Sequence, residues 1–330
     1  MQLAADWFKA PLLDPQETKS TDTRDLSAED LIANHPDPAV RFRHSGWRRA
    51  RKATFAALHD SQATDHQLIA FAACGSNPWL VQSASDPDQF KVHWNTCHSR
   101  WCVPCNGTRA HTIAANLERQ IAEDFYYFAT LTLKHSSTPL RAQIDRIYAS
   151  FRVLRATPFW KTRITGGGAI LEIKHSTRSK QWHPHLHICC RGKNLSQFPL
   201  SDAWFRVTGD SFIVDVDEIR SKRDVARYVT KYVTKPIPFG IYTDPGLLVE
   251  LIQACKGRRT VLTFGDWRGI RLCQKLDSTV WLGCCSIDEL LRRVRRLDPL
   301  AVKQHALLIE RYPGFMAAMS PGPPGNLLPY

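Results

Sequence analysis

The sequence lacks any hydrophobic run long enough to cross a membrane. Its longest apolar stretches, near residues 68–74 and 281–285, fall well short of the roughly 18 residues that a membrane span needs. Residues 1–20 contain no basic segment followed by an apolar one, so they do not predict a signal peptide. No GxxxxGKS or GxxxxGKT loop is present, which excludes a P-loop motor within this sequence. We therefore expect a cytoplasmic protein that depends on a partner for ATP-driven work.

Acidic residues are scarce beside basic ones: 31 Asp and Glu face 44 Lys and Arg, which leaves a net charge of +13. The 330 residues suffice for about two domains, and a hydrophobic content of 43% indicates a folded chain. Basic side chains cluster at residues 41–52, a stretch without an acid, at 256–259 and at 292–296. This clustering predicts a nucleic-acid partner, with Arg48 and Arg49 as contacts. The alternative is a plain solvated surface.

Ten cysteines without a secretion signal favour reduced thiols over disulfides. The spacing Cys97-x4-Cys102-x2-Cys105 suits a structural zinc ion, which prefers four ligands. We expect Cys74, followed by Gly75 at a turn, to be the fourth ligand, and buried thiols without metal are the alternative. Other candidates for the fourth ligand are His93, His98 and His111. The remaining cysteines are expected in the core: Cys189, Cys190, Cys255, Cys273, Cys284 and Cys285.

The hydrophobic pattern predicts an α+β fold on an antiparallel sheet, because strands and helices alternate irregularly from residue 126 onward. Expected strands are 126–134, 166–174, 182–191 and 212–219, and expected helices are 141–156 and 224–235. We expect four regions: a flexible arm at 1–40, a basic helical and Cys-rich zinc-binding region at 41–118, a catalytic domain at 119–275, and a basic helical segment at 276–330. That last segment is expected to end in a disordered Pro/Gly tail from residue 316.

Three histidines mark the second strand of the predicted hairpin. In a strand alternate residues share a face, so His183, His185 and His187 project to one side. Such a row is stable when the imidazoles are neutral and share a cation. Glu172 lies across the hairpin, and two imidazoles with one carboxylate suit Mg²⁺ or Mn²⁺ acting on a phosphate. Alternatively the histidines form a surface row and Glu172 pairs with Lys174 or an arginine.

The expected helix at 224–235 gathers phenols and ammonium groups. At 100° per residue, one arc holds four polar side chains: Tyr228, Lys231, Tyr232 and Lys235. Neighbouring cations and a metal-polarised phosphate favour a phenolate and its attack on phosphorus. The alternative is an amphipathic helix with half-buried tyrosines and lysines that reach into solvent.

Residues 128–133 (FATLTL), 182–187 (WHPHLH) and 228–235 (YVTKYVTK) resemble, in this order, three motifs of the HUH endonucleases. The likeness spans roughly residues 97–268 and is closest to the plasmid replication-initiator (Rep) proteins, with some likeness to two-tyrosine phage gene A-type initiators. The resemblance implies a ferredoxin- or RRM-like antiparallel core. It also implies metal-dependent nicking of single-stranded origin DNA, a 5′-phosphotyrosyl bond and a free 3′ hydroxyl for rolling-circle replication.

The resemblance assigns roles to residues. It makes Tyr232 the primary nucleophile and Tyr228 a second one for termination, with His185 and His187 as metal ligands. The stretch at 256–267 resembles a segment that follows the tyrosine motif in the family. Arginines beside an aromatic ring there suit DNA contacts, so the expected residues are Arg258, Arg259 and Trp267. The alternative is a basic loop capped by a packed tryptophan. The implied partners are origin DNA, a host helicase and a DNA polymerase in a prokaryotic cell that carries a plasmid or phage.

Three other functions fit part of the pattern. An HUH transposase would use the same chemistry on transposon ends. A histidine-triad nucleotide hydrolase or transferase would use the histidines at 183–187 as its phosphoryl acceptor, but it leaves the Tyr/Lys helix unexplained. A non-catalytic zinc-dependent DNA-binding regulator would use only the charge and the cysteines.

Overall fold

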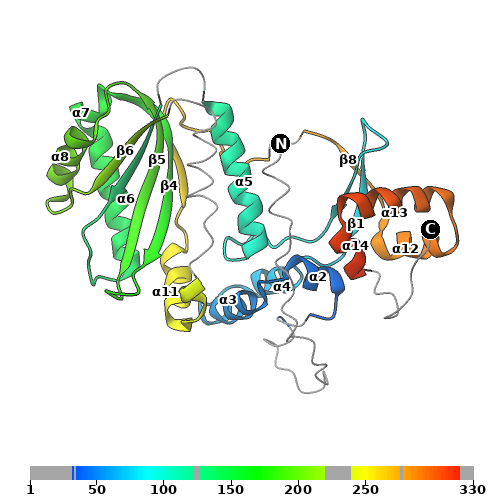
Figure 1. The fold of residues 1–330 in the computed structure, drawn as a ribbon. Helices are drawn as coiled ribbons and strands as arrows, with labels where there is room; N and C mark the ends of the chain where they lie inside the picture. Colours follow the sequence, from blue (N-terminus) through cyan, green and yellow to red (C-terminus); the bar gives the residue numbers. More distant parts are fainter. Residues whose placement is uncertain (1–31, 33–34, 122–125, 220–238, 276–277, 320–330) are drawn as a thin grey trace. The chain divides into compact units, whose positions relative to one another are not determined.

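The computed structural model describes residues 32, 35–121, 126–219, 239–275 and 278–319. Two antiparallel sheets and their helices form two compact units, residues 1–105 with 277–330 and residues 106–276 (Figure 1). The predicted α+β class is confirmed. Among the described residues, no helix combines the length and the apolar character that a membrane span requires.

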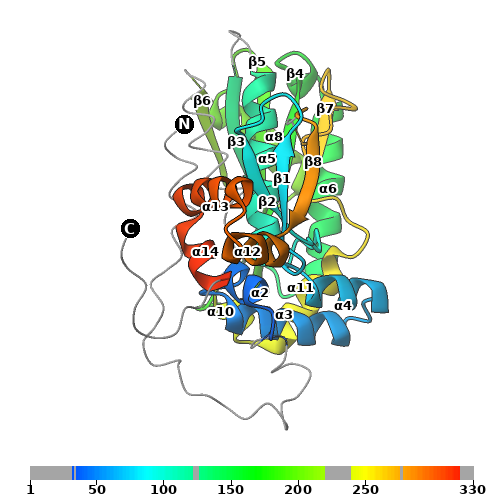
Figure 2. The same cartoon turned by 90° about the vertical axis from the view of Figure 1, so that its right-hand side faces the viewer.

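The first unit joins the two ends of the chain. Its sheet has the strand order β2-β1-β8, with β1 (Trp79–Ser83) between β2 (Phe90–His93) and β8 (Trp281–Ser286). The helices on the N-terminal side are α2 (Pro38–Arg43), α3 (Arg48–Asp60) and α4 (Asp65–Ala72). Those that follow β8, prominent in Figure 2, are α12 (Ile287–Arg295), α13 (Pro299–Arg311) and α14 (Pro313–Met319).

The core of this unit corrects two expectations about the chain ends. Leu80 of β1, Ile287 of α12 and Phe315 of α14 belong to one buried cluster. Residues 38–40, expected in a flexible arm, begin α2, because the Asp37 side chain accepts a hydrogen bond from the Ala39 amide and Ala39 is buried. Residues 316–319, expected in the tail, complete α14, whose methionines pack in the same cluster. Residues 32 and 35–37 of the expected arm are also described, and Ile32 is buried. Residues 1–31, 33–34 and 320–330 lie outside the described residues.

The second unit is built on a five-stranded antiparallel sheet of order β6-β3-β5-β4-β7. The strands are β3 (Tyr126–Thr132), β4 (Ile164–His175), β5 (Trp182–Gly192), β6 (Val214–Ile219) and β7 (Val261–Gly265). Its helices are α6 (Leu140–Ala156), α7 (Pro158–Lys161), α8 (Gln197–Thr208), α10 (Phe239–Tyr242) and α11 (Pro245–Cys255). Helix α5 (Val103–Gln120) begins in the first unit and continues into this one.

Helices pack on both faces of this sheet (Figure 1). On one face lie α6 and α8, and the apolar positions of α6 recur at helical spacing, from Leu140 through Ile144 and Ile147. On the other face α5 packs through Ile113, Leu117 and Ile121 in a cluster that includes Phe128 of β3. A glycine permits the close approach of α5: a Cβ on Gly168 would lie 3.3 Å from Leu117 and 3.0 Å from Leu272.

One half-buried glutamate, Glu250, ties α11 to the start of β5. The Glu250 carboxylate accepts hydrogen bonds from the Leu140 amide at 3.0 Å and from the Trp182 indole at 2.7 Å. Trp182 is the first residue of β5 and is buried. The strand that carries the histidines is therefore fixed at its beginning by a side chain from another element.

Candidate active site and metal centres

The strand register brings the predicted ligands together on one face of the second unit's sheet. Glu172 of β4 lies directly opposite His185 of β5, and His187 lies opposite Thr130 of β3. Residues at every second position of a strand share a face, so all four side chains project to the α5 side. Leu186, between the histidines, projects to the α6 side and is fully buried.

Three side chains form a compact ligand set. One ligand atom from each of Glu172, His185 and His187 lies within 4.8 Å of the others. The His187 Nε2 atom is 2.7 Å from Glu172 Oε2, and His185 Nδ1 is 3.8 Å from the same oxygen. Their exposed fractions are 8%, 9% and 1%. Lys174 also contacts Glu172 Oε2 at 3.2 Å, so the alternative pairing of Glu172 with Lys174 is present beside the ligand set.

Two imidazoles of the histidine row, His185 and His183, favour the neutral form. Burial, followed by the charges of His183 and Lys174, lowers the pKa of His185 to about 3. Burial and the neighbouring His135 also lower the pKa of His183. Neutral imidazole is the form that binds a metal ion, so His185 is available as a ligand at physiological pH.

Hydrogen bonds determine which nitrogen of His185 faces the ligand set. The Leu133 carbonyl can only accept, so His183 Nε2, 3.1 Å away, donates to it. A neutral His183 then accepts at Nδ1 from His185 Nε2, at 2.7 Å. The remaining lone pair of His185, on Nδ1, faces Glu172. His183 therefore lies outside the ligand set and orients His185 instead of joining it.

His187 is oriented in the same manner. Its Nδ1 atom is 3.1 Å from the Thr130 hydroxyl, whose oxygen can accept the ring proton. Nε2 then presents a lone pair toward Glu172 Oε2, 2.7 Å away. Two lone pairs at this distance need a proton between them, and a bound cation would take the place of that proton. The Phe128 ring stacks on the imidazole at 5.8 Å between centroids. The donor set therefore fits a divalent cation.

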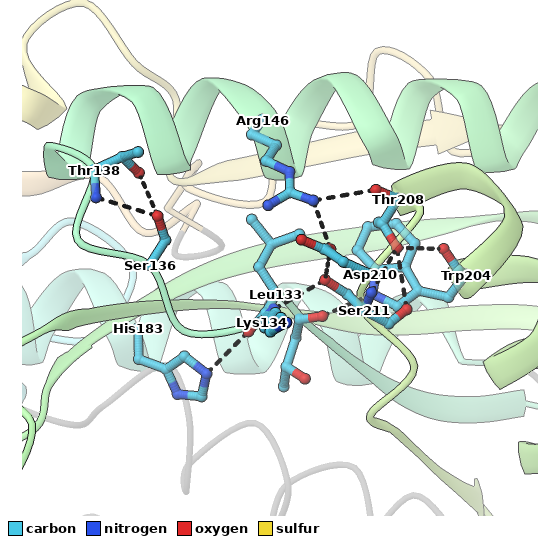
Figure 3. Close-up of polar contacts among 11 residues, drawn as sticks. Leu133, Lys134, Ser136, Thr138, Arg146, His183, Trp204, Thr208, Asp210 and Ser211 are labelled. Carbon is cyan, nitrogen blue, oxygen red and sulfur yellow. Dashed lines mark hydrogen bonds and ion pairs between the residues drawn. The ribbon is translucent and has the colours of Figure 1, made fainter.

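A polar network holds the carbonyl that orients His183 (Figure 3). Next to that carbonyl, the Lys134 amide donates to the Ser211 hydroxyl at 2.9 Å. Ser211 donates to Asp210 at 2.7 Å, and Asp210 accepts from Arg146 of α6 at 2.6 Å. The chain leaving β3 is thus fastened to α6 and to the segment after α8.

Sequence reasoning missed three residues of this site. His135 stacks on His183 with ring centroids 4.0 Å apart, Thr130 contacts His187, and Leu133 supplies the accepting carbonyl. The strand alternation in FATLTL could have placed Thr130 on the histidine face. The expected nucleophiles and their neighbours lie outside the described residues: Tyr228, Lys231, Tyr232 and Lys235.

The predicted cysteines form a second cluster, in the first unit. Their sulfur atoms all lie within 4.8 Å of one another: Cys74, Cys97, Cys102 and Cys105. The separations from Cys74 are 3.8 Å to Cys102 and 3.5 Å to Cys105. Four thiolates about 2.3 Å from a tetrahedral zinc ion are about 3.8 Å apart, so the cluster could hold such an ion. The alternative ligand His98 contacts Thr96 instead.

Positive charge and backbone contacts support the cysteine cluster. Arg43 donates to the Cys105 sulfur at 3.5 Å, and His44 Nε2 donates to the Cys74 carbonyl at 3.1 Å. Hydrogen bonding by Cys102 lowers the pKa of Cys74 and of Cys105, which favours their thiolates, whereas hydrogen bonding by Cys105 raises the pKa of Cys102. Gly75, at φ +99°, turns the chain and donates to the Asn95 carbonyl, which joins the two segments that carry the ligands.

The other cysteines divide between core and surface. As expected, four are buried: Cys189, Cys190, Cys255 and Cys285. The expectation is wrong for Cys273 and Cys284, which are exposed. Cys284 lies on β8, an edge strand of its sheet, and half of the residues of this strand are exposed.

The residues expected to contact DNA differ in accessibility. Arg49 and Arg259 are exposed, Arg48 is partly exposed on α3, and Arg258 is partly exposed and paired with Asp145. Trp267 corrects the expectation: it is only 4% exposed and packs beside Tyr126, so it serves the core and does not offer a ring for base stacking.

Comparison with known proteins gives one distant relative. The chain is similar to "Protein rep" of Streptococcus pneumoniae serotype 2 (strain D39 / NCTC 7466), with 23% identity over 169 residues. The match covers 44% of this chain and 53% of that protein, so it spans about half of the relative's length. No protein-family model matches the chain, and no solved structure matches it.

Proposed function

We propose that this protein is an HUH-type replication initiator that nicks one DNA strand at an origin and later rejoins it. The observation that carries the proposal is the buried set of Glu172, His185 and His187, with ligand atoms within 4.8 Å of one another. The net charge of +13 and the distant relative named "Protein rep" support the same function. In this proposal the catalytic domain is residues 119–275, and the cysteine cluster carries a structural zinc ion.

The chemistry divides between the ligand set and the tyrosine segment. A bound Mg²⁺ or Mn²⁺ ion supplies a Lewis acid for the scissile phosphate. Thr130 and His183 orient the imidazoles that hold it. The Tyr232 phenol oxygen, favoured as phenolate by Lys231 and Lys235, forms a bond to phosphorus. The bond from phosphorus to the 3′ oxygen breaks, and that oxygen takes up a proton.

The products explain both initiation and termination. The cleaved strand ends in a free 3′ hydroxyl that a DNA polymerase can extend, while its other end remains as a 5′-phosphotyrosyl ester. The ester retains the energy of the broken bond, so attack by a 3′ hydroxyl can rejoin the strand. Tyr228 would attack the newly made strand. A host helicase would unwind the duplex in the cytoplasm of a prokaryotic cell.

The decisive experiment identifies the covalent adduct. Wild-type protein is incubated with a labelled single-stranded DNA library and Mn²⁺, and mass spectrometry locates the modified residue. We expect the nucleotide on Tyr232, loss of nicking in Tyr232→Phe, and nearly unchanged DNA binding. Tyr312→Phe, a tyrosine of the first unit, is the matched control and should nick as the wild type does.

Other outcomes point to other functions. An adduct on a histidine would favour nucleotide transfer of the histidine-triad kind. DNA binding without any adduct would favour a zinc-dependent regulator. Selection of transposon ends from the library, with the adduct still on Tyr232, would favour a transposase. If Tyr232→Phe nicks DNA at the wild-type rate, Tyr232 is not the nucleophile.

A further inference from the structure

A basic cleft of about 460 Å³ lies on the opposite face of the second unit's sheet from the histidines. Leu262 of β7 lines it and pairs in register with Ala169, whose side chain projects away from the histidine face. The other wall is α6, where the lining side chains recur at helical spacing. Four arginines line the cleft: Arg152, Arg155, Arg258 and Arg259. Asp145 is the one acid among its lining residues.

The cleft is held in shape by contacts between α6 and the segment that leads into β7. Asp145 pairs with Arg258 through two nitrogens, at 2.7 and 2.6 Å. The Tyr148 hydroxyl donates to the Arg259 carbonyl, and Arg141 donates to the Lys256 carbonyl at 2.9 Å. The backbone of the basic segment is therefore anchored, and its arginines are presented from a fixed position.

Positive charge within the cleft exceeds what the described residues neutralise. The Nε atom of Arg155 is buried and has no hydrogen-bond partner among the described residues. Its guanidinium lies over the Phe151 ring at 4.8 Å and the Phe264 ring at 5.4 Å. Burial, followed by the charges of Arg268 and Arg152, lowers the pKa of Arg155. An anion in the cleft would relieve this crowding of like charges.

Two further guanidinium groups are available at the rim. Arg152 and Arg259 are exposed, and their side chains make no hydrogen bond or ion pair with any described residue. Guanidinium is planar and presents paired donors that match a phosphate group. Asp145 already forms an ion pair with Arg258. The cleft arginines that remain for a ligand are Arg152, Arg155 and Arg259.

We propose that this cleft binds phosphate groups of DNA, at a place separate from the histidine site. The open rim suits an extended polyanion, and a chain of net charge +13 suits the same partner. The choice of DNA as the carrier of the phosphates rests on the proposed function. The cleft would hold backbone away from the nick, so its contacts would add affinity without reading the base sequence.

The test measures DNA affinity as a function of salt. Fluorescein-labelled single-stranded DNA is titrated, without added divalent metal, with the full-length wild type and with the double variant Arg152→Gln/Arg259→Gln. Each lost phosphate contact lowers the slope of log affinity against log salt by about 0.7 for single strands. We expect the slope to become shallower by about 1.4 and the affinity at physiological salt to fall about tenfold, for every sequence tested.

Matched variants distinguish the effect of the cleft on DNA affinity from the effect of the overall positive charge. Arg206→Gln removes one exposed arginine from α8 and should weaken binding less than Arg152→Gln, which removes one from α6. Arg152→Lys/Arg259→Lys keeps the charge and should recover part of the lost affinity. An unchanged salt slope in the glutamine double variant would overturn the proposal.

A second probe distinguishes a nucleic acid from a small phosphate ligand. Pyrophosphate is titrated calorimetrically into the wild type and the double variant. If pyrophosphate binding depends on Arg152 and Arg259 while DNA affinity does not, the ligand is a small phosphate and the proposal for DNA is wrong. If the wild type forms the tyrosine adduct but the Arg152 and Arg259 substitutions do not change DNA affinity, only the proposal for the cleft is wrong. If DNA affinity depends on Arg152 and Arg259 but no covalent adduct forms, only the proposed nicking function is wrong.

Discussion

His187 is the residue on which the candidate site depends most, because both of its ring nitrogens have assigned partners. Nε2 faces Glu172, and Nδ1 faces the Thr130 hydroxyl at 3.1 Å. The imidazole is 1% exposed, so water cannot replace either partner easily. A residue held in this manner keeps one orientation, and the Thr130 contact decides which nitrogen offers its lone pair to a metal ion.

We expect Thr130→Val to weaken metal binding without unfolding the strand. Valine is close in volume to threonine and suits a strand, but it cannot accept the His187 proton. Loss of such a contact behind a metal ligand costs 10- to 100-fold in affinity. The measurement is Mn²⁺ binding followed by electron paramagnetic resonance, with the nicking rate recorded at saturating Mn²⁺.

Thr132→Val is the control for Thr130→Val. Thr132 lies on the same strand and face, but its hydroxyl donates to the Ile213 carbonyl at 2.7 Å and does not contact an imidazole in the described structure. We expect its Mn²⁺ affinity to stay within a few-fold of the wild type. Equal losses in the two variants would mean that Thr130 supports the strand and does not orient His187.

At the scale of elements, the hairpin of β4 and β5 shows how much of the site local sequence can predict. Strict alternation around His185 and His187 predicted a strand, and a short polar connection predicted an antiparallel partner that carries Glu172. The register confirms that Glu172 lies opposite His185. These inferences succeeded because strand periodicity and a tight connection are local properties of the chain.

Pairings between distant segments could not be predicted in this manner. Strand β1 pairs with β8, about 200 residues later in the chain, and neither short strand carries a pattern that selects the other. The sequence favours DNA contacts for the stretch at 256–267, through Arg258, Arg259 and the ring of Trp267. Instead β7 extends the sheet, Gly265 turns the chain at φ +63°, and Trp267 returns into the core.

The contact between α6 and the segment after α8 leads to a prediction about pH. Hydrogen bonds from Arg146, and then from Ser211, lower the pKa of Asp210 below its ordinary 3.8. A lowered pKa stabilises the fold above pH 3.8, and this contribution disappears as the pH falls through the lowered value. At neutral pH we expect Asp210→Asn to lose about 1 kcal/mol, because both partners are more than a third exposed and solvent screens the pair.

Urea denaturation at a series of pH values tests this expectation. The difference between wild type and Asp210→Asn should be largest near neutral pH and should vanish in acid below pH 3.8. Asp202→Asn, which removes a more exposed pair with Arg206 on α8, should change stability by less than about 0.5 kcal/mol. A difference that stays constant with pH would show that the Asp210 charge does not stabilise the fold.

At the scale of the whole molecule, the two units have separate cores and separate candidate metal centres. The cysteine cluster belongs to the first unit, whose buried residues include Leu80 and Phe315. The histidine set belongs to the second unit, whose sheet is covered by its own helices. Loss of one metal should therefore affect one unit before the other.

We expect zinc removal to loosen the first unit and spare the second. Four cysteines link the segment after α4 to the start of α5, and without an ion their thiolates repel one another in a buried place. The measurement is hydrogen exchange of the full chain before and after treatment with a zinc chelator. Amides of α3, α4 and β1 should lose protection, whereas amides of β3, β4 and β5 should keep it.

Single substitutions make the same test without a chelator. Cys74→Ser should abolish zinc binding, measured by elemental analysis, and should reproduce the loss of protection in the first unit. Cys284→Ser is the matched control, because Cys284 lies in the same unit, is exposed and stands outside the cluster. Full zinc content in Cys74→Ser would exclude Cys74 as a ligand. Equal loss of protection in both units would show that they do not unfold independently, because the strands that carry the histidines would then depend on the cysteine cluster.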